Sequence, residues 1–176
     1  ELKETLVLIR DEDDDDTIAA TERAIQDIRQ SYWDRDEEYP DNVHLVTFTD
    51  GPYNKPNGLN RGYAASTKEV ICIFDAEDQP HHDIYNVVNT VMIRDDADVV
   101  QSGVQLMNFK SNWFSAFNVL EYFFWFKSGL HAFTHELGVT PLGGNTVFFK
   151  KIWLDIFAKE DLEDGYRVWD EHGVTE

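Results

Sequence analysis

A continuous apolar run that leads directly into an acidic turn is the feature that most constrains the fold. Residues 69–74 read Glu-Val-Ile-Cys-Ile-Phe, and Asp75-Ala-Glu-Asp-Gln-Pro80 follows without a break. An apolar run that does not alternate with polar residues is typical of a strand covered on both faces, as at the centre of a parallel sheet. The next apolar residues recur at helical spacing and predict an amphipathic helix; they are Ile84, Val87, Val88, Val91 and Met92.

The rest of the chain repeats this alternation of strand and helix. The repeating unit is roughly 25–40 residues long, which is typical of βαβ folds. We therefore predict an α/β fold with a mostly parallel sheet flanked by helices, in a single domain over residues 1–176. The expected strands are 6–9, 43–49, 69–74, 98–101 with a continuation over 103–109, and 147–150; the expected helices are 17–32, 59–66, one from residue 84, 113–126 and 155–173.

The charge balance excludes one class of partner. The chain has 34 Asp and Glu against 15 Lys and Arg, a formal net charge of −19. Such a chain repels phosphate backbones and anionic lipid, so we expect no nucleic-acid partner. The composition fits either a halophilic protein or an acidic mesophilic one. A single cysteine and no secretory signal predict a reducing, cytoplasmic compartment.

The acidic turn after the apolar run is a candidate cation site. Asp75 and Glu77 are two residues apart, at the end of a strand where α/β sheets bind their ligands. Mg²⁺ commonly uses one or two carboxylates together with substrate phosphates. The alternative is an acidic turn that only caps the following helix. The pair His81-His82 is interpreted as exposed histidines rather than as metal ligands.

Further segments carry residues suited to chemistry, each with a plainer alternative. Glu160-Asp161 offers a general base, or else a solvated helix start. Lys55 in a Gly/Pro-rich loop suits an anionic ligand, or else is a surface lysine. Gly143-Gly144 allows close approach of a ligand to the backbone, or else forms a plain turn. The acidic run 11–16 is mostly a solvated helix start, with one carboxylate available to a ligand.

An aromatic stretch stands apart from these polar segments. Residues 113–126 carry more aromatic side chains than one core-facing stripe of a helix requires. The excess suits a partner, a membrane interface or a sugar. Packing in the core is the alternative.

Five short segments follow one another in an order that resembles a known family. They are Lys55-Pro-Asn-Gly-Leu-Asn60, Phe74-Asp75-Ala-Glu-Asp, Asp98-Val-Val-Gln-Ser-Gly-Val-Gln105, Leu142-Gly-Gly-Asn-Thr and Glu160-Asp161. This order resembles the processive family-2 glycosyltransferases, the inverting GT-A-fold enzymes related to cellulose, chitin and hyaluronan synthases. The resemblance runs from about Leu6 to the C-terminus. It implies a GT-A-like, Rossmann-like fold, here lacking the first strand–helix unit.

The resemblance also implies a site. Asp75 and Glu77 match the element that holds Mg²⁺ or Mn²⁺ on the nucleotide diphosphate, with Glu in place of the usual second Asp. Asp161, preceded by Glu160, matches the base that deprotonates the acceptor hydroxyl. The donor-binding residues would be Asp11 or Asp13, Lys55, Asn60 and Asp75, and the residues lining the acceptor would be Gly143, Gly144 and Asn145.

The partners implied by the resemblance are a nucleotide-diphosphate sugar as donor and a glycan or lipid-linked acceptor. Relatives of this kind work at the cytoplasmic face of a membrane, which suits the aromatic stretch. A non-catalytic module that binds a nucleotide sugar or a metal on the same fold is the alternative function.

Overall fold

The computed structural model contains two compact units, which we describe separately. It describes residues 3–11, 15–107, 109–110, 112–138, 146–157, 159–161, 165–167, 169–170 and 173–174, with side chains up to residue 156. The first unit comprises residues 1–71 and 151–176, and the second comprises residues 72–150. The prediction of a single domain over the whole chain stays a prediction.

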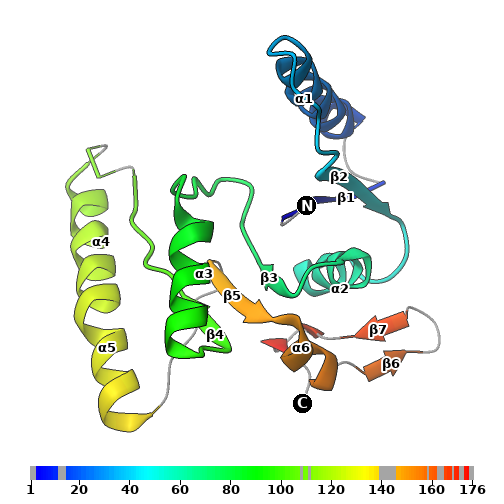
Figure 1. Cartoon of the computed structure of the whole chain (residues 1–176). Helices are drawn as coiled ribbons and strands as arrows, with labels where there is room; N and C mark the ends of the chain where they lie inside the picture. The colour runs from blue at the N-terminus through cyan, green and yellow to red at the C-terminus, as the bar shows by residue number, and fades with distance from the viewer. Residues whose placement is uncertain are drawn as a thin grey trace. The chain divides into compact units, whose positions relative to one another are not determined.

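The first unit is built on a parallel pair of strands. β1 (Thr5–Arg10) pairs with β2 (Val43–Phe48) in an unbroken register from Thr5 opposite Val43 to Arg10 opposite Phe48. Helices α1 (Asp15–Trp33) and α2 (Lys55–Ala65) lie on opposite sides of this pair (Figure 1). The predicted α/β fold with a parallel sheet flanked by helices is therefore confirmed.

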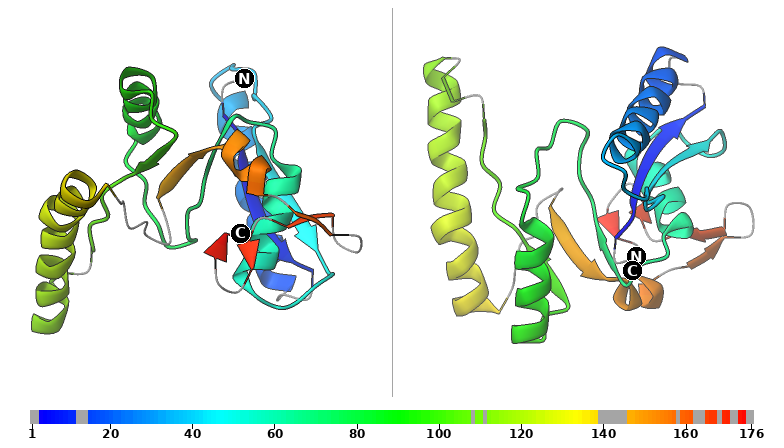
Figure 2. Two further views of the ribbon diagram at one scale, coloured as in Figure 1. Left: turned by 90° about the horizontal axis from the view of Figure 1, so that it is seen from below. Right: turned by 45° about the horizontal axis from the view of Figure 1, so that its top comes forward.

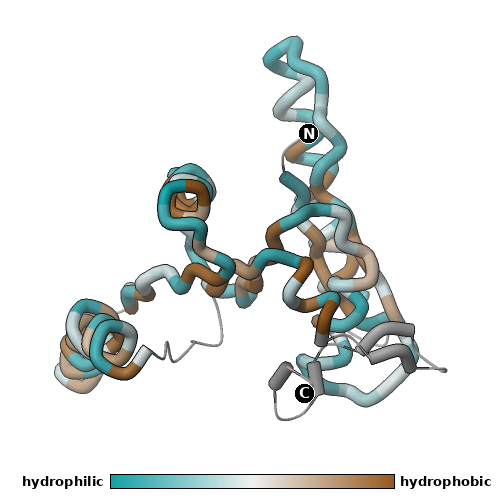
Figure 3. Tube along the Cα trace, turned by 60° about the horizontal axis from the view of Figure 1, so that its bottom comes forward, coloured by the Kyte–Doolittle hydropathy of each residue, from teal (hydrophilic) through white to brown (hydrophobic). Residues whose placement is uncertain are grey.

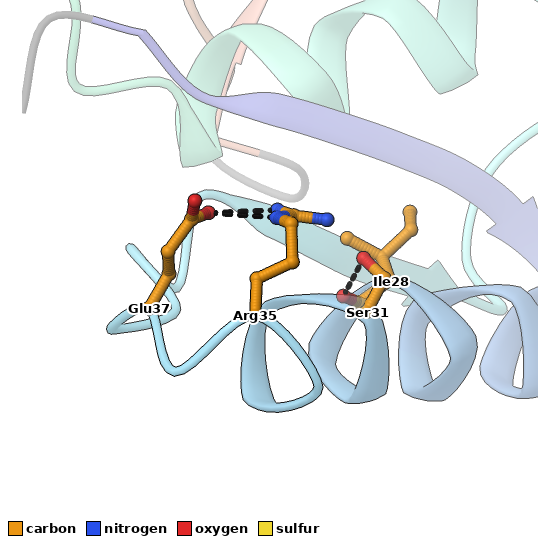
Figure 4. Close-up of polar contacts among 4 residues, drawn as sticks. All are labelled: Ile28, Ser31, Arg35 and Glu37. Atoms are coloured by element: carbon orange, nitrogen blue, oxygen red, sulfur yellow. Dashed lines mark hydrogen bonds and ion pairs between the residues drawn. The ribbon is translucent and has the colours of Figure 1, made fainter.

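Helix α1 is mostly hydrophilic along its length (Figure 3). Ile25 is its buried residue. Two acidic residues in its first turn interact favourably with the positive end of the helix dipole. Its last turn is closed locally: the Ser31 hydroxyl donates to the Ile28 carbonyl at 2.7 Å (Figure 4). Beyond the helix, Arg35 Nε donates to Glu37 Oε2 at 2.9 Å. These contacts support the turn that leads to β2.

Helix α2 begins four residues earlier than predicted. The Asn54 side chain accepts a hydrogen bond from the Asn57 N–H and caps the helix, and Pro56 is tolerated in the first turn. The expectation that Lys55 lies in a loop was therefore wrong, because residues 55–58 form the first turn of α2. Gly62 permits close packing on β1, since a Cβ there would lie 2.8 Å from Leu8 Cδ1.

The second unit is built around a small three-stranded sheet. β3 (Val70–Cys72) carries the chain from the first unit into the second, and the sheet has the order β3-β5-β4. β4 (Val99–Gln101) and β5 (Val147–Lys150) run antiparallel. The predicted continuation of a strand over 103–109 was wrong for its described residues, because β4 ends at Gln101, opposite the first residue of β5.

The core of the second unit lies where helix α3 (Ile84–Asp95) meets the sheet. Val88, Met92 and Phe148 are buried together. Partly buried side chains complete this cluster: Cys72, Phe74, Ile84 and Val100. The helical period read from the sequence was therefore confirmed for Ile84, Val88 and Met92, whereas it was wrong for Val87, which is 58% exposed.

A long helical run follows in the second unit (Figure 2). It comprises α4 (Trp113–Phe124), the π-helix η1 (Trp125–Gly129), α5 (Leu130–Ala132) and the π-helix η2 (Phe133–Leu137). Apolar residues recur along it (Figure 3), yet α4 has no buried residue. Trp113 is 81% exposed and Phe117 is 61% exposed. The aromatic stretch thus does not form a core in the described residues.

The chain then returns to the first unit through α6 (Lys151–Phe157). Lys151 Nζ donates to the Ser66 carbonyl at 2.8 Å, and the Tyr63 hydroxyl bonds to the Asp155 carboxylate. Leu154 is buried. The predicted helix over 155–173 was confirmed for residues 155–157 and wrong for the described residues after them, because α6 ends at Phe157. Short strands follow: β6 (Lys159–Asp161), β7 (Gly165–Arg167), β8 (Trp169–Asp170) and β9 (Gly173–Val174).

Candidate active site

A pocket of about 290 Å³ lies at the carboxyl edge of the β1–β2 pair. Open α/β sheets bind ligands at this edge. The first turn of α2 forms one wall, so backbone N–H groups and the positive end of a helix dipole lie nearby. The pocket is lined by Leu8, Arg10, Phe48, Pro52, Tyr53, Asn54, Lys55, Gly58 and Leu59.

Arg10 organises the loop that forms the outer wall of this pocket. Its guanidinium donates to the Thr49 carbonyl at 2.9 Å and to the Gly51 carbonyl at 3.0 Å. It also lies over the Tyr53 ring, 5.3 Å from the ring centroid. One side chain at the end of β1 therefore fixes both the path of the loop and the position of an aromatic ring in the pocket.

Asn57 fixes the same loop from the helix. Its side chain is buried, and its Nδ2 donates to the Asp50 carbonyl at 2.7 Å and to the Pro52 carbonyl at 3.2 Å. Gly51 packs against this amide with a positive φ of 84°, and a Cβ there would lie 2.8 Å from Asn57 Oδ1. Loop and helix are thus locked together.

The acidic turn lies in the second unit. Asp78 closes it, because its N–H donates to the Asp75 carbonyl at 3.0 Å and its Oδ2 accepts from the Asp75 N–H at 2.8 Å. Asp75 is half-buried and Glu77 is exposed. Asp75 and Glu77 are thus carried on one compact turn, and both present oxygen ligands of the kind that Mg²⁺ and Mn²⁺ prefer.

Two other segments singled out in the sequence meet beside this turn. The Thr146 N–H donates to the Ile73 carbonyl at 2.9 Å, two residues before Asp75. Gln101 Nε2 donates to Thr146 Oγ1 at 3.3 Å, and the Ser102 N–H donates to the Thr146 carbonyl at 3.1 Å. Thr146 is buried. It therefore ties the end of β4 to the strand that leads into the acidic turn.

Asp98, from the same segment as Gln101, serves a structural purpose. Lys150 Nζ donates to its carboxylate at 2.8 Å, and the Lys150 N–H donates to its carbonyl at 2.9 Å. The hydrogen bond to Asp98 raises the pKa of Lys150. These contacts fix the pairing of β4 with β5.

Glu160 and Asp161 lie on a hairpin in the first unit. β6 pairs with β7 so that Glu160 is opposite Tyr166 and Asp161 is opposite Gly165. β7 contacts α2, the helix whose first turn lines the pocket. The sequence predicted a helix over 155–173 that would include both residues, whereas the backbone puts them on a strand.

Of the remaining residues predicted for the donor and acceptor sites, some lie in the part of the chain that the structure describes and others do not. Lys55 lines the pocket. Asp11 follows β1, and its N–H donates to the Phe48 carbonyl at 3.0 Å. Asn60 lies in the interior of α2 and does not line the pocket. Four residues lie outside the described residues: Asp13, Gly143, Gly144 and Asn145.

Sequence reasoning missed Arg10, Tyr53 and Asn57. Arg10 and Asn57 act on backbone carbonyls of a loop, and no residue pattern signals such contacts. Tyr53 had one usable signal, since it is the one aromatic residue in the turn-rich segment that precedes Lys55.

The chain matches the family model described as glycosyltransferase-like family 2 over residues 5–171. The chain belongs to this family. The match includes both units and the five ordered segments, and the α/β fold described above is consistent with a GT-A-like domain of the family. No curated protein and no solved structure gives a significant match. In the described part of the chain, no helix has the length and hydropathy needed to cross a bilayer.

Proposed function

We propose that this family-2 domain transfers a sugar, with inversion, from a nucleotide-diphosphate sugar to an acceptor hydroxyl. The family match over residues 5–171 is the observation that carries the proposal. We further propose kinship with the cellulose, chitin and hyaluronan synthases within the family. The order of the five segments in the sequence supports this narrower placement.

The pocket in the first unit is the proposed donor site. Its Lys55 and the first turn of α2 suit a diphosphate, because both present positive charge. The Tyr53 ring, held by Arg10, offers a flat surface on which a base can stack. Asp11, directly after β1, is proposed to accept hydrogen bonds from the base or ribose, a role that Asp13 shares in the proposal.

Asp75 and Glu77 are the proposed ligands of Mg²⁺ or Mn²⁺. The donor set fits, because both residues offer carboxylate oxygens from one turn, and Mg²⁺ commonly uses one or two carboxylates together with substrate phosphates. A bound divalent cation would offset the negative charge that develops on the diphosphate leaving group. Asp75 is also proposed to contact the donor. Asn60 stays a proposed donor residue, although it does not line the pocket.

Asp161 is the proposed general base. Its carboxylate would take the proton from the acceptor hydroxyl as that oxygen attacks the anomeric carbon, and Glu160 would assist in placing it. Gly143, Gly144 and Asn145 would line the acceptor. The contacts of Thr146 beside the acidic turn support this, since that residue follows the glycine-rich segment directly.

The acceptor is proposed to be a glycan or a lipid-linked sugar reached at the cytoplasmic face of a membrane. The exposed aromatic side chains of α4 support contact with a lipid interface. The net charge of −19 favours zwitterionic over anionic lipid. Sedimentation with zwitterionic vesicles tests this point, and a W113A/F117A variant that sediments like the parent chain would contradict it.

The decisive variant is Asp161→Asn. Release of nucleoside diphosphate is followed for a set of sugar nucleotides with Mn²⁺, and nucleotide binding is followed by calorimetry. We expect D161N to lose turnover and to keep nucleotide affinity, because only proton transfer is removed. Asp95→Asn, a surface aspartate paired with Arg94, is the matched control and should leave both unchanged. Unchanged turnover in D161N would remove Asp161 from the proposed role.

A further inference from the structure

A group of two histidines and one aspartate lies just before helix α3. His81, His82 and Asp83 each offer one ligand atom, and these atoms lie within 4.8 Å of one another. Among the described residues, no other set of three or more His, Cys, Asp or Glu residues meets this geometric condition. The three residues follow the acidic turn but are separate from Asp75 and Glu77.

The two imidazoles both face Asp83. His81 Nδ1 accepts a hydrogen bond from the Asp83 N–H at 3.2 Å, and His82 Nε2 lies 3.2 Å from Asp83 Oδ2. The two rings lie against each other with centroids 4.2 Å apart. One ring nitrogen of each histidine therefore lies next to the same aspartate.

The backbone holds this arrangement on a fixed turn. The Ile84 N–H donates to the His81 carbonyl at 3.0 Å, and the Val87 N–H donates to the Asp83 carbonyl at 3.0 Å. Asp83 precedes the first residue of α3, but its carboxylate does not cap the helix N–H groups. It therefore remains directed toward the imidazoles and Asn86, whose Nδ2 lies 3.5 Å from Asp83 Oδ1.

From this geometry we propose that His81, His82 and Asp83 form a second divalent-cation site, selective for Zn²⁺-type ions. Two imidazole nitrogens and one carboxylate oxygen suit Zn²⁺, Co²⁺, Ni²⁺ or Cu²⁺, whereas Mg²⁺ prefers oxygen ligands alone. An ion here takes the Nδ1 lone pair that now accepts from the exposed Asp83 N–H. Water completes the coordination, since all three residues are exposed.

This proposal is independent of the proposed transferase activity, so the test uses metal ions without nucleotide. The full chain is titrated with Zn²⁺ in a large excess of Mg²⁺, and Co²⁺ absorption reports nitrogen ligation. The test variant is H81A/H82A. The matched control is H131A/H135A, which removes another exposed pair with rings stacked 6.5 Å apart but with no carboxylate grouped with them.

We expect the parent chain and H131A/H135A to bind one Zn²⁺ equally well. H81A/H82A should lose more than about 100-fold in affinity, because removing residues that only orient metal ligands already costs roughly 10–100-fold. Circular dichroism of each variant checks that it is folded. The variant Asp83→Asn keeps both imidazoles and should bind Zn²⁺ more weakly than the parent chain. Absence of Mg²⁺-resistant binding by the parent chain, or equal binding by H81A/H82A, would overturn the proposal.

Discussion

Replacing Asn57 by alanine should release the loop that forms the outer wall of the pocket. The change removes two hydrogen bonds from Nδ2, to the carbonyls of Asp50 and Pro52. At roughly 0.5–1.5 kcal/mol net for each bond, the free energy of unfolding should fall by about 1–3 kcal/mol. The cap itself survives, because the Asn57 backbone N–H still donates to Asn54.

A double-mutant cycle with Gly51→Ala tests the mechanism rather than the size of the effect. Alone, G51A should lower the free energy of unfolding by about 1–2 kcal/mol, because alanine is strained in the left-handed backbone conformation of this position. The new Cβ would also lie only 2.8 Å from Asn57 Oδ1, so it should push the Asn57 amide away from its partners. In the N57A background that amide is gone, so only the backbone cost should remain. The two costs should therefore sum to more than the cost of the double variant, by about 1–3 kcal/mol.

Urea unfolding of the four proteins measures this coupling, and Asn89→Ala, an exposed position in α3, is the control with an expected effect within about 0.5 kcal/mol. Additive costs for G51A and N57A, or an N57A effect no larger than that of N89A, would refute the reasoning about the loop.

Three further predictions concern packing and titration. Phe148→Ala should lower the free energy of unfolding by about 3–5 kcal/mol, because the ring is 3% exposed in the cluster with Val88 and Met92; urea titration measures it, and a loss under about 1 kcal/mol would contradict the packing. Burial raises the pKa of Cys72 from 9.0 to about 12, so iodoacetamide at pH 9 should label it slowly in the native chain and quickly in urea. The contribution of the protonated Cys72 thiol to the stability of the native chain is complete below pH 9 and is lost as the pH rises toward about 12. Equal labelling rates in the native and unfolded chain would contradict the raised pKa. Burial acts to raise the pKa of Glu4, but hydrogen bonds from Thr67 outweigh it, so the pKa is lowered below 4.5. Its stabilisation should be present above pH 4.5 and lost as the pH falls through the folded value; a Glu4→Gln variant whose deficit does not shrink in acid would disprove it.

The sequence predicted the elements whose residues carry their own periodic signal. The apolar period of α3 identified its buried residues Val88 and Met92, and the apolar runs of β1, β2 and β5 identified strands. The sequence-based prediction failed for strands whose ends are set by pairing with another strand. β4 ends opposite the first residue of β5, and the strands after Phe157 are defined by pairing with each other.

The candidate site was predictable only in part, for a related physical reason. Lys55 stood out as a lysine in a Gly/Pro-rich segment, and the turn at Asp75 stood out as carboxylates directly after an apolar run. Arg10 and Asn57 were missed because their partners are carbonyl groups 39–42 and 5–7 residues away, which any residue can supply. Thr146 was missed as an anchor because its contacts join three distant segments.

We propose above all that this family-2 domain binds a nucleotide-diphosphate sugar through a divalent cation on Asp75 and Glu77. Calorimetric titration with a set of nucleoside diphosphates, with and without Mn²⁺, tests it most directly. We predict that one or more nucleotides bind when Mn²⁺ is present, and that binding weakens strongly without the cation and in the Asp75→Asn variant. No binding of any nucleoside diphosphate, or binding of equal strength without Mn²⁺ and in D75N, would rule out a cation-mediated donor site at Asp75 and Glu77.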